Sequence, residues 1–106
     1  MAETIIIWTS TAARQRREIL KYWTTHNHSD EYARKLIKIT KDRVKIIAKY
    51  PVSGIETAIP DTRMVAMGHF SIYYKNADNK IIIVAFWDNR QDPSTLLELI
   101  KNKNST

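Results

Sequence analysis

The sequence predicts an α+β fold with the element order β-α-α-β-β-β-α, in which a helical hairpin packs on a small, twisted antiparallel sheet. The run Ile81–Phe86, continued by Trp87, is apolar, rich in β-branched residues and too short to span a membrane, so it predicts a strand. Residues 12–26 and 30–50 carry apolar side chains at helical spacing. A chain of 106 residues has room for one core, so we expect a single domain over residues 1–106.

The N-terminal third predicts a strand over Thr4–Trp8 and a helix from Ala12 to about His26. Hydroxyl residues at positions 9–11 can cap this helix. Its apolar stripe consists of Ala12, Ile19, Leu20 and Trp23. The basic residues between them could track phosphates, but a solvated face is the more common use of such a pattern. These basic residues are Arg14, Arg16, Arg17 and Lys21.

A second helix is predicted to begin at an N-cap, Ser29, and to end at Tyr50, before Pro51. One apolar stripe should face the sheet, and it comprises Ala33, Leu36, Ile37, Thr40, Val44 and Ile47. A second stripe either packs on the first helix or docks another chain, and it comprises Ile39, Ile46 and Tyr50. Between the helices, His26, His28 and Asp30 could in principle bind a metal, but no further His or Cys completes a shell.

The C-terminal half predicts two strands, 63–67 and 70–75, that meet at a Gly68-His69 turn and continue through residues 76–79 into the strand 80–87. Short connections imply antiparallel pairing of these three strands. Strict alternation places Ile81, Ile83, Ala85 and Trp87 on one face and Ile82, Val84 and Phe86 on the other. Residues 55–59 form a linking segment of uncertain conformation.

A last helix is predicted from Asp92-Pro93, with an apolar face of Leu96, Leu97 and Ile100, before a frayed tail over residues 102–106. The helical hairpin covers one face of the sheet, and this last helix is the remaining cover for the other. If it does not lie there, the apolar strand requires a partner.

Composition excludes several classes of protein. Without cysteine, neither a disulfide framework nor a thiolate zinc site is possible. With two glycines and no GxGxxG or P-loop motif, we expect no glycine-rich phosphate loop. The start lacks a signal peptide pattern and no segment reaches spanning length, so we expect a cytoplasmic protein. A formal charge of +6 draws the chain to anionic partners such as nucleic acid, ribosomes or an acidic protein.

The ordered pattern Arg63-x-x-x-x-Gly68-x-Phe70-x-Ile72-x-Tyr74, followed by a turn, an Ile/Val strand and Arg90, resembles the RelE/ParE superfamily of toxins from toxin–antitoxin pairs. The strand, helical hairpin and Pro51-x-x-Gly54 before it also fit, so the resemblance covers roughly residues 5–90. It implies a small toxin held in a hetero-oligomer by a cognate antitoxin, which wraps it with a helix and an extended segment.

The two branches of this superfamily differ in their action. RelE-like members cut messenger RNA on the ribosome, often with a His or Tyr near the C-terminus, whereas ParE-like members poison DNA gyrase without hydrolysing RNA. Metal-independent RNA cleavage would require a base, a cation and a proton donor. The candidates for these roles are Arg63, His69, Tyr74 and Arg90.

No His or Tyr follows Arg90, and the spacing from Arg63 to Gly68 matches the ParE-like pattern better. We therefore favour a gyrase-directed toxin that is not an enzyme, with a ribosome-dependent endoribonuclease as the alternative. A non-toxic interaction module of the same fold is a third possibility.

The predicted site residues fall into two groups. Those expected to bind the target are Arg63, Trp87, Asp88, Asn89 and Arg90, with the arginines together on one rim of the sheet. Those expected to bind the antitoxin are Ile39, Ile46, Tyr50, Ile82, Val84 and Phe86. As alternatives, Arg63 pairs with Glu56 or Asp88 and has no other role, and the rings of Trp8 and Trp87 are buried in the core. No metal or cofactor is expected, so chelators should leave activity unaltered.

Overall fold

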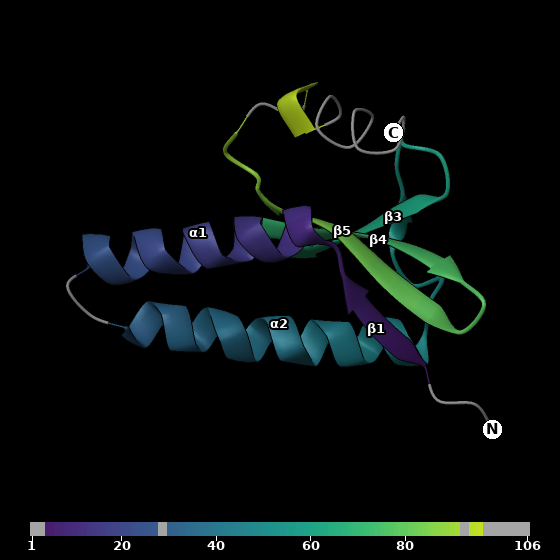
Figure 1. The fold of residues 1–106 in the computed structure, drawn as a ribbon, viewed down its shortest axis with the longest axis horizontal. Coiled ribbons are helices and arrows are strands. Elements are labelled where there is room, and N and C mark those ends of the chain that lie inside the picture. The colour runs from purple at the N-terminus through teal and green to yellow at the C-terminus, as the bar shows by residue number, and fades with distance from the viewer. Residues whose placement is uncertain (1–3, 28–29, 92–93, 97–106) are drawn as a thin grey trace.

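The computed structural model describes residues 4–27, 30–91 and 94–96. Its elements in chain order are β1 (Ile5–Trp8), α1 (Ser10–His26), α2 (Glu31–Lys49), β2 (Ile55–Glu56), β3 (Thr62–Met67), β4 (Phe70–Ala77) and β5 (Lys80–Asp88). Two antiparallel helices lie side by side and extend beyond one end of a twisted sheet (Figure 1). The predicted α+β class, with a helical hairpin on a sheet, is confirmed.

Within the described residues the sheet has five strands in the order β1-β5-β4-β3-β2. Strands β3, β4 and β5 pair antiparallel as predicted, but β1 pairs with β5 in parallel, so the sheet is mixed. The fifth strand, β2, arises from the segment whose conformation the sequence left open. Because β1 and β5 run in the same direction, α1 and the residues after β5 both leave the same end of the sheet.

The helix boundaries follow from local chemistry. Thr9 is the N-cap of α1, where its Oγ1 accepts a hydrogen bond from the Ala12 amide at 3.2 Å, as the hydroxyl residues predicted. The N-cap of α2 is Asp30 rather than Ser29, so that detail of the prediction is wrong. Helix α2 ends at Lys49, and the Tyr50 amide donates to the Ile46 carbonyl just before the chain turns at Pro51.

The main core cluster lies between the helices and the sheet. It is built around three buried residues of β4, which are Phe70, Ile72 and Tyr74, and three of β5, which are Ile81, Ile83 and Phe86. Helix α1 contributes Ala12 to this cluster, and helix α2 contributes Leu36 and Ile47. Ile19, Leu20 and Trp23 are half-buried against it, which confirms the stripe predicted for the first helix.

A β-bulge in β5 changes which residues share a face. Tyr73 pairs with Ala85 but Tyr74 pairs with Ile83, so Val84 is an extra residue without a partner in β4. Beyond the bulge the alternation is shifted by one position, and Phe86 joins Ile81 and Ile83 on the helix-covered face. The predicted face assignment is therefore wrong after Ile83.

The opposite face of the sheet carries a smaller cluster of Ile59, Ala85, Trp87 and Leu96. Residues 94–96 are helical, and Leu96 packs where the last helix was expected to provide cover. Asp92-Pro93, Leu97, Ile100 and the predicted frayed tail lie outside the described residues. None of the described helices is both long and apolar enough to cross a bilayer.

Candidate functional site

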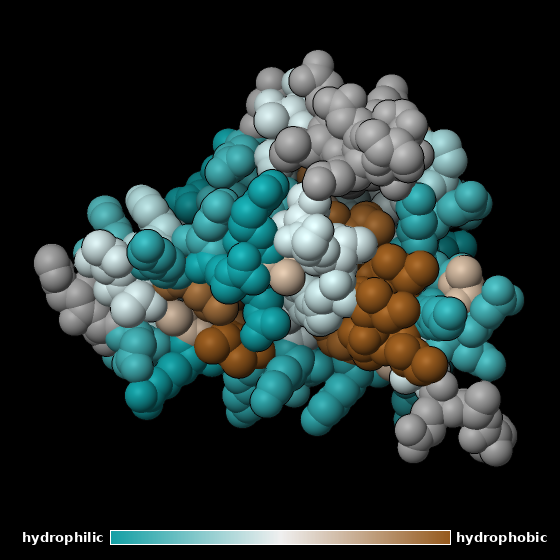
Figure 2. Space-filling model, in the orientation of Figure 1, coloured by the Kyte–Doolittle hydropathy of each residue, from teal (hydrophilic) through white to brown (hydrophobic). Residues whose placement is uncertain are grey.

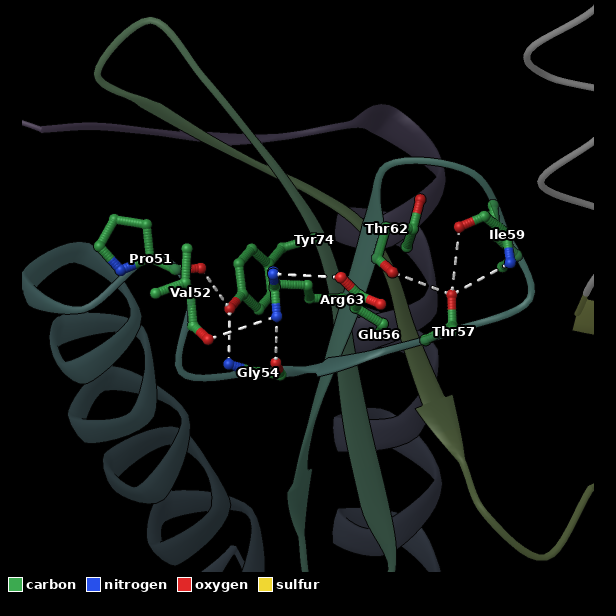
Figure 3. A network of polar contacts seen from close by, with 9 residues as sticks. All are labelled: Pro51, Val52, Gly54, Glu56, Thr57, Ile59, Thr62, Arg63 and Tyr74. Carbon is green, nitrogen blue, oxygen red and sulfur yellow. Dashed lines mark hydrogen bonds and ion pairs between the residues drawn. The ribbon is translucent and has the colours of Figure 1, made fainter.

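Two residues of the motif, Arg63 and Tyr74, contact the chain that leaves α2 (Figure 3). The Tyr74 ring is fully buried, and its hydroxyl donates to the Pro51 carbonyl at 2.7 Å and accepts from the Gly54 amide at 3.0 Å. A Cβ atom on Gly54 would lie 2.6 Å from the Tyr74 hydroxyl, a distance that van der Waals radii forbid. The spacing Pro51-x-x-Gly54 thus reflects close approach of this turn to Tyr74.

Arg63 belongs to the same network. Its Nη1 donates to the carbonyls of Gly54 at 2.8 Å and Val52 at 3.3 Å, and its Nη2 lies 3.5 Å from a carboxylate oxygen of Glu56 (Figure 3). These contacts hold the turn after α2 and the short strand β2 against β3. The alternative in which Arg63 pairs with Glu56 describes the observed geometry.

Arg90 lies at the opposite end of the sheet, two residues after β5. It forms a bidentate ion pair with Asp88, with distances of 3.0 Å from Nε to Oδ1 and 2.6 Å from Nη2 to Oδ2. Its backbone amide also donates to Asp88 Oδ1 at 2.9 Å. The guanidinium carbon lies 5.4 Å from the ring centre of Trp23 on α1, within the range of a cation–π interaction. Two separate contacts therefore orient Arg90.

The electrostatics of this pair follow from its geometry. The hydrogen bonds from Arg90 hold the pKa of Asp88 below its ordinary value, and the nearby His69 acts in the same direction. In return, the hydrogen bond and charge of Asp88 raise the pKa of Arg90. Both groups are therefore charged across the physiological range of pH. The Arg90 side chain is 54% exposed, so its charge stays accessible to a partner.

The loop after β5 is held by Asn89. Its side-chain oxygen accepts from the Ser71 hydroxyl at 2.8 Å, its side-chain amide donates to the Gly68 carbonyl at 3.3 Å, and its backbone amide donates to the His69 carbonyl at 2.8 Å. His69 itself is exposed on the β3–β4 turn. The three polar residues 88–90 and His69 therefore form one constellation at this end of the sheet.

A cleft of about 550 Å³ opens beside this constellation, between α1 and the residues that follow β5. Its lining residues are Arg14, Gln15, Glu18, Ile19, Tyr22, Trp23, Phe86, Trp87, Asp88, Arg90, Gln91 and Thr95. Tyr22 stacks on His26 with ring centres 5.3 Å apart, which adds an exposed aromatic surface near the rim. We call this cleft, with Asp88 and Arg90 at its edge, the Arg90 cleft.

Sequence reasoning missed the wall that α1 contributes to the Arg90 cleft. The Gln15 side-chain oxygen accepts a hydrogen bond from the Phe86 amide at 2.9 Å and so joins α1 to β5 beyond the bulge. Tyr22 and Trp23 then lie beside the end of β5. The missing information was the parallel pairing of β1 with β5, which sends α1 toward this end of the sheet.

The structure does not bring Arg63 and Arg90 together. Arg63 lies opposite Tyr74 and Asp88 lies opposite Phe70, so the two pairs are four positions apart along β4, roughly 13 Å of strand. The prediction that both arginines lie on one rim is therefore wrong. The candidate nuclease residues divide into Arg63 and Tyr74, which are half-buried and buried in the network after α2, and His69 and Arg90, which are exposed at the other end of the sheet.

The remaining predicted site residues are also dispersed. Trp87 is buried with Leu96, as the core alternative proposed, whereas Trp8 is half-buried at the sheet edge. The residues proposed for antitoxin binding do not form one surface. Ile46 and Tyr50 are exposed, Ile39 on α2 and Ile82 and Val84 on β5 are half-buried, and Phe86 is 1% exposed within the core.

Across residues 4–27, 30–91 and 94–96, no three His, Cys, Asp or Glu side chains gather as metal ligands would. His28, a member of the candidate metal triplet, lies outside these ranges. The absence of a metal or cofactor requirement stays a prediction.

Comparison with known proteins agrees with the fold. The chain is similar to a solved structure of the chromosomal ParDE TA system from P. aeruginosa, with 19% identity, a TM-score of 0.69, and coverage of 80% of this chain and 95% of that one. At this identity the likeness establishes the fold alone. No curated protein matches the sequence. Residues 6–93 match the family described as the ParE toxin of the type II toxin–antitoxin system parDE, and because this match spans most of the chain, the protein belongs to the ParE toxin family.

Proposed function

We propose that this protein is a toxin that inhibits DNA gyrase by binding to it, without chemistry of its own, and that a cognate antitoxin neutralises it in the cytoplasm. Membership of the ParE toxin family supports the toxin role. The choice of gyrase over messenger RNA comes from the ParE-like branch of the resemblance. Geometry supports binding rather than catalysis.

The observation that carries this proposal is that Tyr74 and Arg63 are both hydrogen-bonded to the chain that follows α2. Cleavage of RNA requires a proton donor and a cation that both reach the scissile phosphate. Tyr74 is fully buried with its hydroxyl bonded to two backbone groups, and three oxygens contact the Arg63 guanidinium. Neither residue lies beside the Arg90 cleft.

Arg90 is the residue best suited to bind a target. Its guanidinium is exposed yet oriented by Asp88 and Trp23, so little conformational entropy is lost when it contacts a partner. A fixed, exposed arginine beside aromatic side chains is the composition typical of a binding hot spot. We therefore assign target binding to the Arg90 cleft.

A supercoiling assay with purified protein and gyrase tests this proposal. The wild-type chain should block supercoiling and accumulate cleaved DNA, and Arg90→Ala should raise the inhibitory concentration by about tenfold or more. Arg17→Ala provides a matched control, because Arg17 is an exposed arginine of α1 that does not line the cleft. Unchanged supercoiling and unchanged DNA cleavage with wild-type protein would remove the gyrase assignment.

The nuclease alternative retains one supporting observation, the proximity of His69 and the Asp88–Arg90 pair. Primer extension on translated messages would detect cuts at fixed codon positions, and their loss in His69→Ala would assign catalysis to this end of the sheet. Absence of both gyrase inhibition and RNA cuts, together with no growth arrest on expression, would favour a non-toxic interaction module.

A further inference from the structure

The positive charge of the chain is concentrated in its two long helices. Together α1 and α2 carry eleven basic and three acidic residues, a net charge of +8. The rest of the sequence carries six basic and eight acidic residues, a net charge of −2. The formal charge of +6 therefore comes entirely from these helices. A strong charge asymmetry within one small domain is a feature of proteins that bind polyanions.

Helix α2 carries a row of lysines on its solvent-facing side. These lysines are Lys38, Lys41, Lys45 and Lys49. They recur every three or four residues, so they share one face of the helix, and all four are exposed. The opposite face is buried at Leu36, Thr40 and Ile47. Figure 2 shows hydrophilic side chains projecting along α2, whereas the apolar surface gathers over β1 and β5. We call the four lysines the basic stripe.

Neighbouring side chains do not neutralise the basic stripe. The three ion pairs among the described residues all use arginine, so none includes a lysine of the stripe. Asp42 is the only acidic residue between Lys38 and Lys49, so the stripe keeps a net positive charge. Each lysine lies three or four positions from the next, a spacing at which like charges repel and opposite charges stabilise a helix. A polyanion bound along this face would relieve the repulsion.

The composition of this face favours nucleic acid over an acidic protein as the ligand. The core of a protein–protein interface is depleted in lysine and enriched in aromatic side chains, whereas protein–DNA interfaces are strongly positive. Ile46 is the exposed apolar residue in this part of α2. It follows Lys45 directly and so lies about 100° around the helix from it. The stripe therefore lacks the apolar centre that a protein partner would need.

The length of the stripe fits the backbone of a duplex. From Lys38 to Lys49 it extends roughly 17 Å along the helix axis. Duplex DNA carries one phosphate charge per about 1.7 Å of its axis, so roughly ten phosphates fall within this length. Lysine contacts phosphate as a point charge on a flexible stem, which suits contacts that do not depend on sequence. The stripe contains no aromatic residue on which an unpaired base could stack.

We infer that the basic stripe of α2 binds the phosphate backbone of duplex DNA without reading its sequence. This inference goes beyond the proposed function, because it gives the chain a second ligand on a separate surface. The lining of the Arg90 cleft contains no residue of α2. Because gyrase acts on duplex DNA, a toxin bound to gyrase through the Arg90 cleft would have this ligand nearby.

Fluorescence anisotropy with the full chain and a labelled duplex of about 20 base pairs tests the inference. Two duplexes of unrelated sequence should bind with affinities within about threefold of each other, since phosphate contacts carry no sequence information. The logarithm of the binding constant should fall with the logarithm of the salt concentration, with a slope of about −3 to −4 for four lysine contacts. A poly-glutamate peptide of equal charge should bind at least about tenfold more weakly, because its charges are more widely spaced.

The double variant Lys38→Gln/Lys45→Gln should weaken duplex binding at least about tenfold at low salt and make the salt slope about two units shallower. Glutamine and lysine have similar helix propensities, so α2 should stay folded. Lys75→Gln/Lys80→Gln is the matched control, because it makes the same change in net charge on β4 and β5. It should weaken binding less than about threefold. Circular dichroism would confirm that both variants are folded.

Equal losses in the two double variants, or no duplex binding at low salt, would overturn the inference. Binding of poly-glutamate as tight as that of the duplex would also overturn it and would identify an acidic protein as the ligand. Gyrase is absent from this assay, so its outcome is independent of the supercoiling test. Duplex binding without gyrase inhibition would refute the proposed target and leave the assignment of the stripe standing. Gyrase inhibition without duplex binding would do the reverse.

Discussion

The Tyr74 hydroxyl satisfies two backbone groups at the turn between α2 and β2, on the path from the helical hairpin to the last three strands. It accepts from the Gly54 amide and donates to the Pro51 carbonyl, while the ring fills the core below. A buried amide that loses its acceptor retains the full cost of its removal from water. Tyr74 is therefore first of all a structural residue.

Replacement of Tyr74 by Phe should lower the free energy of unfolding by about 1–3 kcal/mol, because the buried Gly54 amide loses its partner. Urea denaturation followed by circular dichroism measures this change. Tyr50→Phe is the control, since the Tyr50 ring is exposed, and it should change stability by less than about 0.5 kcal/mol. Equal stability of Tyr74→Phe and the wild type would show that water replaces the hydroxyl without cost.

The Asp88–Arg90 pair should make stability depend on pH in acid. Hydrogen bonds from Arg90 lower the pKa of Asp88 in the folded chain. A carboxyl with a lowered pKa contributes stability above its unfolded pKa, about 3.9, and this contribution is lost as the pH falls through the folded pKa. The stability difference between wild type and Asp88→Asn should therefore shrink as the pH falls from about 6 to below about 3.

Urea midpoints measured across this range of pH test the expectation. Arg90→Ala removes the same stabilising contact, so its difference from the wild type should shrink over the same range. A difference that stays constant with pH for both variants would mean that the pair does not perturb the ionisation of Asp88.

At the scale of elements, the helices and the three long strands could be predicted because each carries its own apolar pattern. Strand β2 could not, because Ile55 and Glu56 are both exposed and form a strand only through pairing with Met64 and Arg63. The bulge at Val84 was equally hidden, since Ile81–Phe86 is apolar at every position and any alternation fits it. Local pattern determines the element, whereas register depends on the neighbouring strand.

Mutations in the connection from α2 to β2 should be energetically coupled to mutations at Tyr74 of β4. In Gly54→Ala the new Cβ would lie 2.6 Å from the Tyr74 hydroxyl, so this variant should lose about 1–3 kcal/mol of stability. The loss should be smaller in a Tyr74→Phe background, which removes the closest atom, with a coupling of at least about 0.5 kcal/mol in a double-mutant cycle.

Gly68→Ala supplies the control for this cycle. Gly68 has φ +74° and no heavy atom lies within 4 Å of the position that an added Cβ would take, so alanine there is strained by its backbone alone. Its cost should therefore be the same with Tyr74 or Phe at position 74. If the stability losses of Gly54→Ala and Tyr74→Phe are also additive, the turn in Gly54→Ala moves away from Tyr74 and so avoids the close contact.

Over the whole molecule, the two arginines of the superfamily pattern serve opposite ends of the sheet. From the sequence we predicted that both arginines bind the target on one rim of the sheet. The sequence pattern does not show the distance between them. That separation depends on the registers with which β3 and β5 pair with β4, which the pattern of each strand alone does not determine. At one end of the sheet, Arg63 joins the turn after α2 to β3. At the other end, Arg90 exposes to solvent a charge that Asp88 and Trp23 orient.

This division predicts that stability and inhibition can be separated by mutation. Arg63→Ala removes the donors to the carbonyls of Val52 and Gly54, and it should lower the free energy of unfolding by about 1–3 kcal/mol. Inhibition of gyrase per folded molecule should be unchanged. Arg90→Ala should do the opposite, with only a small fall in the urea midpoint near neutral pH from the loss of the ion pair with Asp88 and about a tenfold weaker inhibition.

Both quantities can be measured on the same preparations, with urea unfolding to correct the concentration of folded protein in each supercoiling assay. Arg63→Lys refines the comparison, because a lysine keeps the charge but cannot reproduce the two-carbonyl contact of the guanidinium. Lost inhibition in a stably folded Arg63→Lys variant would place Arg63 in the target interface. In that case the target would have to extend along the sheet to the turn after α2, since four positions of β4 separate the partners of Arg63 and Asp88.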